Sequence, residues 1–191
     1  MSGVKADSRP TVGRRIVVAI GGGIAAYKSA TLVSRLVQQG DDCSVVLTRA
    51  AQKFVGPATL AALCNKAPVL SAFDDRYPMG PHIELADGCD LLVIAPATAR
   101  ILASCAHGLA DDLLATLFLC VTCPVLIAPA MSAAMWEKAP VQRNVMQLQA
   151  DGVHMIGPSE GWLSCRQTGT GRMSEAAEIL VEANKLLKDV G

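Results

Sequence analysis

Hydrophobic and polar positions follow two different periods along the first part of the chain. Residues 15–20 are an almost unbroken run of apolar, mostly β-branched side chains, which is typical of a strand buried on both faces of a sheet. After the glycines at 21–23, apolar residues recur at helical spacing over residues 26–37, and Gly40 ends the predicted helix. This segment therefore predicts a buried strand followed directly by a helix.

The same order of strand and helix repeats through the rest of the chain. Further strands are predicted at residues 43–48, 90–95, 124–128 and 153–156. Further helices are predicted at residues 57–63, 98–106, 111–120 and 141–150, followed by a last amphipathic helix with Ser174 as its N-cap. The alternation predicts an α/β fold: a single Rossmann-like (flavodoxin-like) domain with a parallel sheet and helices on both faces. We place this domain at residues 14–191, after a polar N-terminal arm at 1–13 that we expect to be flexible.

Loops that directly follow the predicted strands are the candidates for a binding site. Parallel sheets bind ligands at the carboxyl ends of their strands, near the point where the strand order reverses. Those loops lie at residues 21–24, 48–50, 96–101 and 129–136. Residues 157–173 are predicted to form a longer loop rich in glycine and polar residues, which at that length is usually a lid or a binding segment.

Composition and charge restrict the class of protein. Hydrophobic residues make up 51% of the 191 residues and charged residues 18%, which supports a packed core and excludes a largely disordered chain. Lys and Arg together number 17, as do Asp and Glu, so the formal charge is zero and favours neither nucleic acid nor anionic lipid as a partner. The apolar stretch at residues 16–27 is too short to cross a membrane, and its glycines argue against a signal peptide.

The seven cysteines are odd in number and are scattered mostly through apolar segments. Reduced, buried thiols of a cytoplasmic protein fit this pattern better than a disulfide framework. Cys120 and Cys123 have the spacing of a redox motif, but they end a predicted helix instead of starting one, so we interpret them as core thiols. Cys165 differs from the other six because it lies in the long glycine-bearing loop, near Arg166 and Arg172, and it alone is placed for chemistry. No set of metal ligands emerges from the sequence.

The glycine-rich turn at residues 21–23 and the hydroxyl of Thr98 each allow two interpretations. Glycines between a strand and a helix let backbone amides approach a phosphate, but a plain tight turn is equally consistent with them. The spacing matches neither a dinucleotide-binding motif nor a P-loop. Thr98 is placed to cap a helix, with or without a ligand beside it.

A group of sulfur-containing and aromatic side chains follows the strand at 124–128. Met131, Met135 and Trp136 are consistent with core packing, or with a flat polarisable wall for an aromatic cofactor. His82 follows a loop with proline and glycine, and it is either a general base or a structural histidine.

Taken together, these segments resemble the flavin-containing cysteine decarboxylase family. The matching motifs run in family order over nearly the whole domain: residues 22–28, Gly80 with 82–85, 95–99, 108–113, 129–131 with 135–136, and Cys165 with Gly169 and 171–173. The resemblance implies FMN as the cofactor.

The resemblance also assigns roles to individual residues. His82 is expected as the base and Cys165 as the proton donor. The residues expected at the flavin are Gly22, Gly23, Ile24, Thr48, Arg49, Ala50, Thr98, Ala99, Arg100, Ile101 and Ala130. The residues expected at the substrate are Ser132, Met135, Trp162, Leu163 and Ser164.

The implied reaction is FMN-dependent decarboxylation of the cysteine moiety of 4′-phosphopantothenoylcysteine to 4′-phosphopantetheine, in coenzyme A biosynthesis. Oxidation of the substrate thiol to a thioaldehyde creates an electron sink β to the carboxylate, which a cysteine carboxylate otherwise lacks. Decarboxylation then gives an enethiolate. In the reducing branch of the family a hydride returns and the cysteine supplies a proton, so the net reaction loses CO₂ only.

Three positions depart from the family pattern. Ser132 stands where the family has an asparagine that holds the substrate carboxylate. Binding of that carboxylate is therefore expected to be weaker, or its position shifted. Arg100 replaces an asparagine or aspartate, and Arg166 replaces the usual glycine after Cys165. The alternatives are therefore a peptidyl-cysteine oxidative decarboxylase, which stops at the enethiol, or a catalytically impaired regulatory flavoprotein. A flavin prenyltransferase is disfavoured because it lacks the motif at residues 82–85.

The resemblance also implies partners and a location. We expect a cytoplasmic homo-oligomer, a trimer or a dodecamer built of trimers, with FMN bound between subunits. Many relatives continue into a ligase that joins cysteine to phosphopantothenate, so a separate phosphopantothenate–cysteine ligase is a further expected partner.

Overall fold

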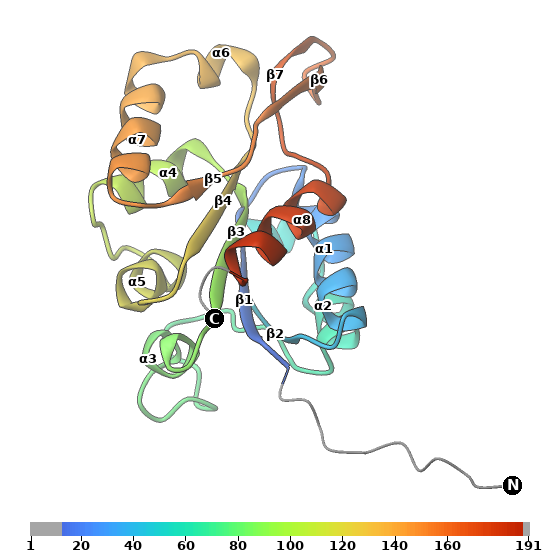
Figure 1. Ribbon diagram of the computed structural model, residues 1–191, viewed down its shortest axis with the longest axis vertical. Coiled ribbons are helices and arrows are strands. Elements are labelled where there is room, and N and C mark those ends of the chain that lie inside the picture. The colour runs from blue at the N-terminus through green and yellow to red at the C-terminus, as the bar shows by residue number, and fades with distance from the viewer. Residues whose placement is uncertain (1–12, 189–191) are drawn as a thin grey trace, which may run out of the picture.

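Five parallel strands form the central sheet of the protein, shown by the computed structural model in Figure 1, which describes residues 13–188. Apart from Gly13, the predicted N-terminal arm at 1–13 lies outside the described residues. The strands lie in the order β2-β1-β3-β4-β5, which is the order of a flavodoxin-like fold. Their bounds are β1 (Arg15–Ile20), β2 (Asp42–Leu47), β3 (Leu91–Ala97), β4 (Val125–Pro129) and β5 (His154–Met155). The predicted fold class is confirmed.

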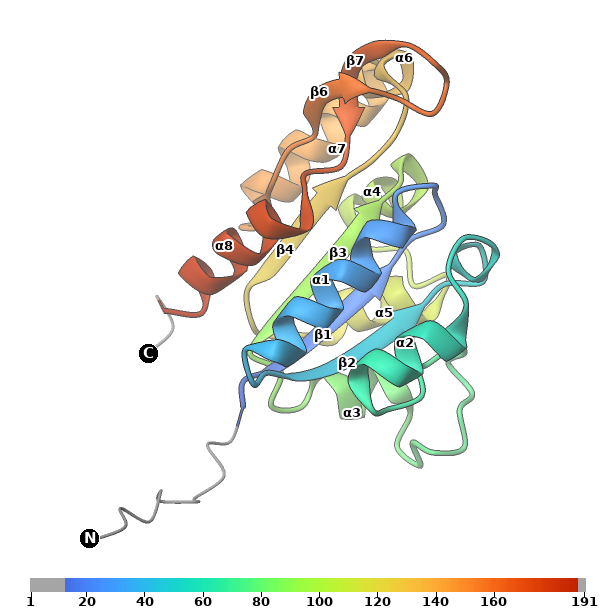
Figure 2. The ribbon, with the colours of Figure 1, turned by 90° about the vertical axis from the view of Figure 1, so that its right-hand side faces the viewer.

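Helices cover both faces of this sheet, because side chains alternate along each strand. Ile16, Val18 and Ile20 of β1 pack on one face, against α1 (Ala26–Gln38), α2 (Pro57–Cys64) and α8 (Ala176–Leu186). Val17 and Ala19 pack on the other face, against α3 (Pro81–Ala86), α4 (Ala99–Ala106), α5 (Leu113–Cys120) and α7 (Ala139–Ala150). Figure 2 shows α1 and α8 side by side on the first of these faces.

The strand order reverses between β1 and β3, and this fixes the place of a ligand site. β2 pairs with one edge of β1 and β3 with the other, all parallel. The connections that leave β1 and β3 therefore part on opposite faces of the sheet, and a crevice opens at their carboxyl ends. Among residues 13–188, no helix combines the length and the apolar character needed to cross a membrane.

The structure corrects several local predictions. Residues 157–173 are not a loop, because they contain an antiparallel hairpin of β6 (Ser159–Trp162) and β7 (Thr168–Arg172). The short helices α3 and α6 (Ala133–Trp136) were not predicted. Ser174 does not cap the last helix: its side chain is buried, and Glu175 is the N-cap, in a reciprocal capping box with Glu178.

Candidate active site

An open cavity of about 850 Å³ lies at the carboxyl ends of the central strands. Its wall brings together most of the predicted site residues: Gly22, Gly23, Ile24, Thr48, Ala50, Thr98, Ala99, Arg100, Ala130, Ser132, Met135, Trp162, Leu163, Ser164 and Cys165. Arg49 lines a neighbouring cavity of about 720 Å³ that shares Thr48, Ala50 and Arg100 with the first. Ile101 is buried, and its backbone N–H donates to the Thr98 hydroxyl at 3.5 Å. These predicted residues therefore line one continuous cavity, with Arg49 and Ile101 beside it instead of in its wall.

The turn after β1 needs a residue without a side chain, because another loop crosses close to it. A Cβ atom on Gly22 would lie 2.2 Å from Cβ of Ala50, far inside van der Waals contact. The helix that follows, α1, has no side-chain cap at its N-terminus and no acidic residue in its first turn. Its first backbone N–H groups therefore lie at the positive end of the helix dipole, beside the cavity, where an anionic group is stabilised.

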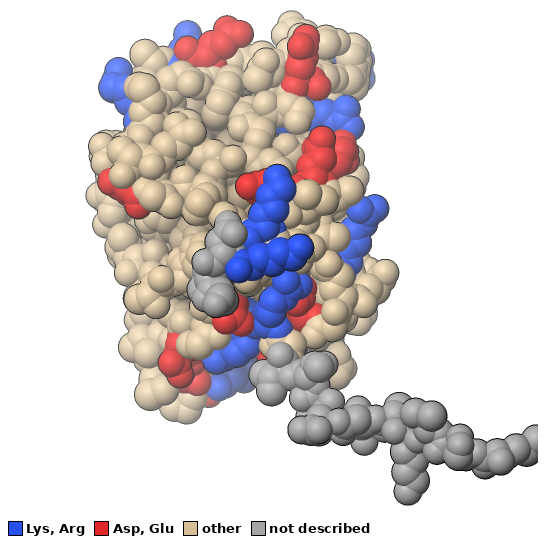
Figure 3. Space-filling model, in the orientation of Figure 1, with Lys and Arg blue, Asp and Glu red and all other residues tan. Residues whose placement is uncertain are grey.

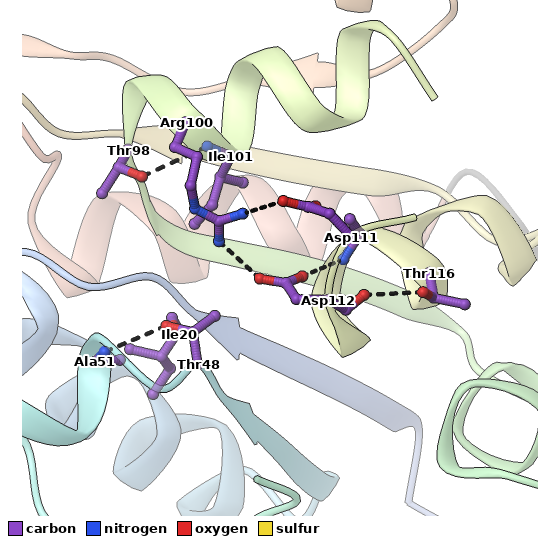
Figure 4. Close-up of polar contacts among 10 residues, drawn as sticks. Ile20, Thr48, Ala51, Thr98, Arg100, Ile101, Asp111, Asp112 and Thr116 are labelled. Carbon is purple, nitrogen blue, oxygen red and sulfur yellow. Dashed lines mark hydrogen bonds and ion pairs between the residues drawn. The ribbon is translucent and has the colours of Figure 1, made fainter. Parts of the chain in front are cut away.

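Thr48 and Thr98 fix the two loops that border this turn (Figure 4). The Thr48 hydroxyl donates to the Ile20 carbonyl at 3.0 Å and accepts from the Ala51 N–H at 3.2 Å, at the start of the short 3₁₀ helix η1 (Ala51–Lys53). Thr98 is the N-cap of α4, as predicted. Hydroxyls used in this way hold the ends of β2 and β3 in place around the cavity.

Arg100 lies in the first turn of α4, where the helix dipole disfavours a cation. Two carboxylates compensate it: its guanidinium donates to Asp111 at 3.0 Å and to Asp112 at 2.7 Å (Figure 4). Asp112 also caps α5, since its second carboxylate oxygen accepts from the Ala115 N–H at 2.9 Å. Arg100 is therefore held at the wall between the two cavities.

The hairpin of β6 and β7 carries Cys165 at its tip. Residues 163–167 form a tight turn, in which the Arg166 N–H donates to the Leu163 carbonyl at 2.9 Å, and Arg166 has a φ of 62°. At the base of the hairpin, β7 packs directly on the loop after β4: the Met131 N–H donates to the Gly171 carbonyl at 3.0 Å. Cys165 is exposed but lines the cavity together with Ser132, whose hydroxyl makes no capping bond to α6.

His82 lies away from this cavity. It is in the first turn of α3, which packs on α5 near the amino ends of the strands, whereas the hairpin stands at the opposite end of the sheet (Figures 1 and 2). The His82 ring folds against Gly80, and its buried Nδ1 atom has no hydrogen-bond partner among the described residues. One chain therefore does not bring His82 and Cys165 to one substrate.

The other thiols lie outside the cavity wall. The Cys123 thiol donates a hydrogen bond to Cys89, which lowers the pKa of Cys89 to about 7, and burial raises the pKa of Cys105 to about 12. Cys43 and Cys64 form a second contacting pair, in which the hydrogen bond between the two thiols raises the pKa of Cys43. Cys120 is exposed, so the prediction that it is a core thiol was wrong, whereas Cys123 is half-buried and packs against the hydrophobic core. Within the described range, no three His, Cys, Asp or Glu residues cluster closely enough to hold a metal ion.

Residues that the sequence did not assign to the site also line the cavity. They are Ala25, Tyr27, Lys28, Met131, Gly171, Arg172 and Met173. Lys28 had a detectable signal, because a lysine in the first turn after a glycine-rich loop opposes the helix dipole and needs a partner. The methionine pair, with Ile24 and Trp162, forms an apolar wall, while the α1 N-terminus supplies polar N–H groups. An apolar wall with one anion-stabilising end suits a flat aromatic ring that carries a phosphate.

Comparison with known proteins agrees with this arrangement. The Flavoprotein family profile matches residues 4–188. The chain is 42% identical over 173 residues to the coenzyme A biosynthesis bifunctional protein CoaBC of Bacillus subtilis, covering 90% of this chain and 43% of that protein. For CoaBC of Haemophilus influenzae, the identity is 43% over 168 residues, covering 87% and 42%. The chain thus spans less than half the length of these relatives.

Two solved structures share the whole fold. The FMN-dependent cysteine decarboxylase SpaF is 32% identical, with a TM-score of 0.82 over 94% of this chain and 99% of that one. A PPC decarboxylase variant complexed with pantothenoylaminoethenethiol is 28% identical, with a TM-score of 0.81 over 92% and 99%. With the family profile matching nearly the full length and the cavity at the strand-order switch, this chain belongs to the Flavoprotein family.

Proposed function

We propose that this chain binds FMN and decarboxylates the cysteine moiety of 4′-phosphopantothenoylcysteine to give 4′-phosphopantetheine. The observation that carries the proposal is the single cavity that joins the glycine-rich turn, the methionine wall and the Cys165 hairpin. The similarity to CoaBC proteins and to SpaF supports both the cofactor and the reaction class.

Each part of the cavity has a counterpart in the cofactor. The uncapped N-terminus of α1 and the loop at Thr48 would hold the phosphate. Met131, Met135 and Ile24 would face the ring, and Gly23, whose absent side chain would meet only the Thr98 methyl group at 3.8 Å, leaves room for it. When bound, FMN supplies an acceptor for two electrons from the substrate thiol and returns them before product release.

The chain's own residues then handle the protons and the carboxylate. The proposed base, His82, would remove the proton of the substrate thiol while the adjacent carbon loses a hydride. This leaves a thioaldehyde β to the carboxylate. CO₂ departs with its bonding electrons left in the enethiolate. The Cys165 thiol would protonate the carbon that lost CO₂, and a hydride would return to the sulfur-bearing carbon. The base would give its proton back to the sulfur and water would reprotonate Cys165, so the products differ from the substrate by CO₂ alone. The Ser132 hydroxyl, free of any capping bond, would contact the substrate carboxylate.

His82 enters this scheme only if a second copy of the chain supplies it. We propose a homo-oligomer, a trimer or a dodecamer of trimers, in which α3 of one copy approaches the cavity of the next. Apolar side chains are exposed at both places: Trp162 (65%), Tyr27 (59%) and Ile24 (57%) at the cavity, and Met79 (65%) and Ile83 (47%) at α3. In Figure 3, wide areas over α4, α5 and α7 also carry few charged side chains. Surfaces of this kind are typical of subunit interfaces.

Flavin absorbance and a histidine variant test the proposal together. Apo protein titrated with FMN should acquire a bound-flavin spectrum, and light scattering should give an oligomer. His82→Asn removes the base with little change in volume, so decarboxylation should be lost while FMN stays bound. Turnover of His82→Asn at the wild-type rate would remove His82 from the reaction. Protein that stays colourless with excess FMN would refute the cofactor assignment.

Ser132 favours a second candidate. A shorter side chain than the family's asparagine is consistent with a peptidyl-cysteine substrate and the oxidative branch, or with a regulatory flavoprotein without turnover. Cys165 at the cavity favours the reducing branch, because only that branch needs a proton donor there.

All seven cysteines are free thiols, which supports the cytoplasm as the location.

A further inference from the structure

The hairpin that carries Cys165 has little internal support. Its two strands form a sheet of their own, separate from the central sheet. An isolated two-stranded hairpin is marginally stable in water, so its position depends on what holds its base. One of those contacts is the bond from the Met131 N–H to Gly171 on β7.

α6 also packs on β7, and a further contact comes from α1. Lys28 is a buried lysine in the first turn of that helix. Its ammonium donates to the Met173 carbonyl at 3.2 Å and to the Glu175 carboxylate at 2.8 Å. The same Glu175 oxygen accepts from the Arg172 guanidinium, at the end of β7. Lys28 thus joins the helix beside the glycine-rich turn to the chain segment that leaves the hairpin.

Neither helix stability nor a surface ion pair explains this lysine. A cation in the first turn of a helix opposes the helix dipole, and burial of an ammonium group costs free energy unless it is paired. Lys28 instead satisfies two acceptors around the β7–α8 junction. Glu175 also begins α8 through its capping box, so its carboxylate joins the helix start, Lys28 and Arg172 in one network. Figure 2 shows α1 and α8 lying together beneath the hairpin, consistent with this connection.

We propose that Lys28 is a positioning residue that holds the Cys165 hairpin over the cavity through Met173 and Glu175. The inference rests on the proposed function for its catalytic consequence, because only the reducing branch uses Cys165 as a proton donor. Loss of the tether lets the hairpin open, and the enethiol then leaves before it is protonated. The enethiol has two hydrogens fewer than the normal product, and the electron pair that it leaves on bound flavin is taken up by dioxygen under air.

The test compares Lys28→Met with a rescue variant, Lys28→Arg, and with Lys185→Met as a control. Lys185 is an exposed lysine of α8 that pairs with Glu182 at 2.8 Å, so its loss removes an ion pair away from the hairpin. In Lys28→Met, amide hydrogen exchange over residues 159–172 should accelerate about tenfold or more, and the ratio of enethiol to thiol product should rise by a similar factor. Lys28→Arg should restore both largely, and Lys185→Met should change neither.

Amide exchange reports whether Lys28 holds the hairpin, and the product ratio reports whether the hairpin matters for the proposed reaction. If the wild-type protein releases no CO₂, the proposed function fails, while exchange over residues 159–172 still decides whether Lys28 holds the hairpin. Wild-type exchange and product ratio in Lys28→Met would overturn the inference. If Lys28→Met does not fold, Glu175→Gln decides, because it removes the charge pairs and keeps Lys28 bound to Met173. Unchanged exchange in Glu175→Gln, or global unfolding of both variants, would reduce Lys28 to a general structural role.

Discussion

Gly22→Ala tests whether the glycine-rich turn is shaped by its contact with the loop after β2. The added Cβ would lie 2.2 Å from Cβ and 2.8 Å from the carbonyl carbon of Ala50. Carbon atoms prefer about 3.5–4.0 Å, so the Ala50 loop must move by roughly 1.5 Å. That loop is fixed by the two Thr48 hydrogen bonds and does not yield freely.

Overpacking of this kind costs about 1–3 kcal/mol. For a domain of this size, each kcal/mol lowers the unfolding midpoint by about 2–4 °C, so we expect a decrease of roughly 4–8 °C for a cost of about 2 kcal/mol. The neighbouring Gly23→Ala is the matched control. Its Cβ would meet only the Thr98 methyl group, at 3.8 Å, an ordinary contact.

Thermal unfolding of the two apo proteins, followed by circular dichroism, gives the comparison. Gly23→Ala should unfold at the wild-type temperature and Gly22→Ala several degrees below it. Equal midpoints for both variants would refute the account of this turn. Measurement without FMN matters because both glycines line the cavity and ligand binding would otherwise contribute to stability.

Two further predictions concern the polar network. Asp112→Ala removes the α5 cap as well as a bond to Arg100, so it should lower the free energy of unfolding by about 1–2 kcal/mol in urea. Asp111→Ala removes only a half-exposed ion pair and should cost less than about 0.5 kcal/mol, and equal losses would contradict the capping role. Hydrogen bonding to Lys28 lowers the pKa of Glu175 below its ordinary 4.5, so its contribution to stability is complete above that pH and is lost as the pH falls through the lower folded-state value. Glu175→Gln should therefore flatten the acid limb of the stability profile, and an unchanged limb would show that Glu175 does not titrate against Lys28.

The parallel sheet was predictable because its strands are buried on both faces and therefore appear in the sequence as short, continuous apolar segments. For this reason the predicted strand at residues 15–20 coincides with β1, and α4 begins after Thr98 as expected. The ligand side of the sheet followed from the same alternation, since parallel strands place their carboxyl ends together.

The hairpin and α3 could not be predicted by the same signal. Residues 168–172 are three polar residues and two glycines with no apolar alternation, and they form a strand by pairing with β6 and packing on the loop at Met131. The helix around His82 has six residues, too few for a helical period to emerge. Ser174 has the ordinary preference for a helix cap, but burial of its side chain leaves the cap to Glu175. Tertiary contacts determine the structure at each of these positions. The local sequence pattern carries no information about such contacts, because the contacting residues are far apart in the chain.

The mass of the product formed from 4′-phosphopantothenoylcysteine tests the central claim most directly. Purified protein with FMN should convert this substrate into a product that has lost CO₂ and nothing else. Loss of CO₂ together with two hydrogens would place the chain in the oxidative branch. Unchanged substrate, with FMN bound, would contradict the claim that this chain is a phosphopantothenoylcysteine decarboxylase.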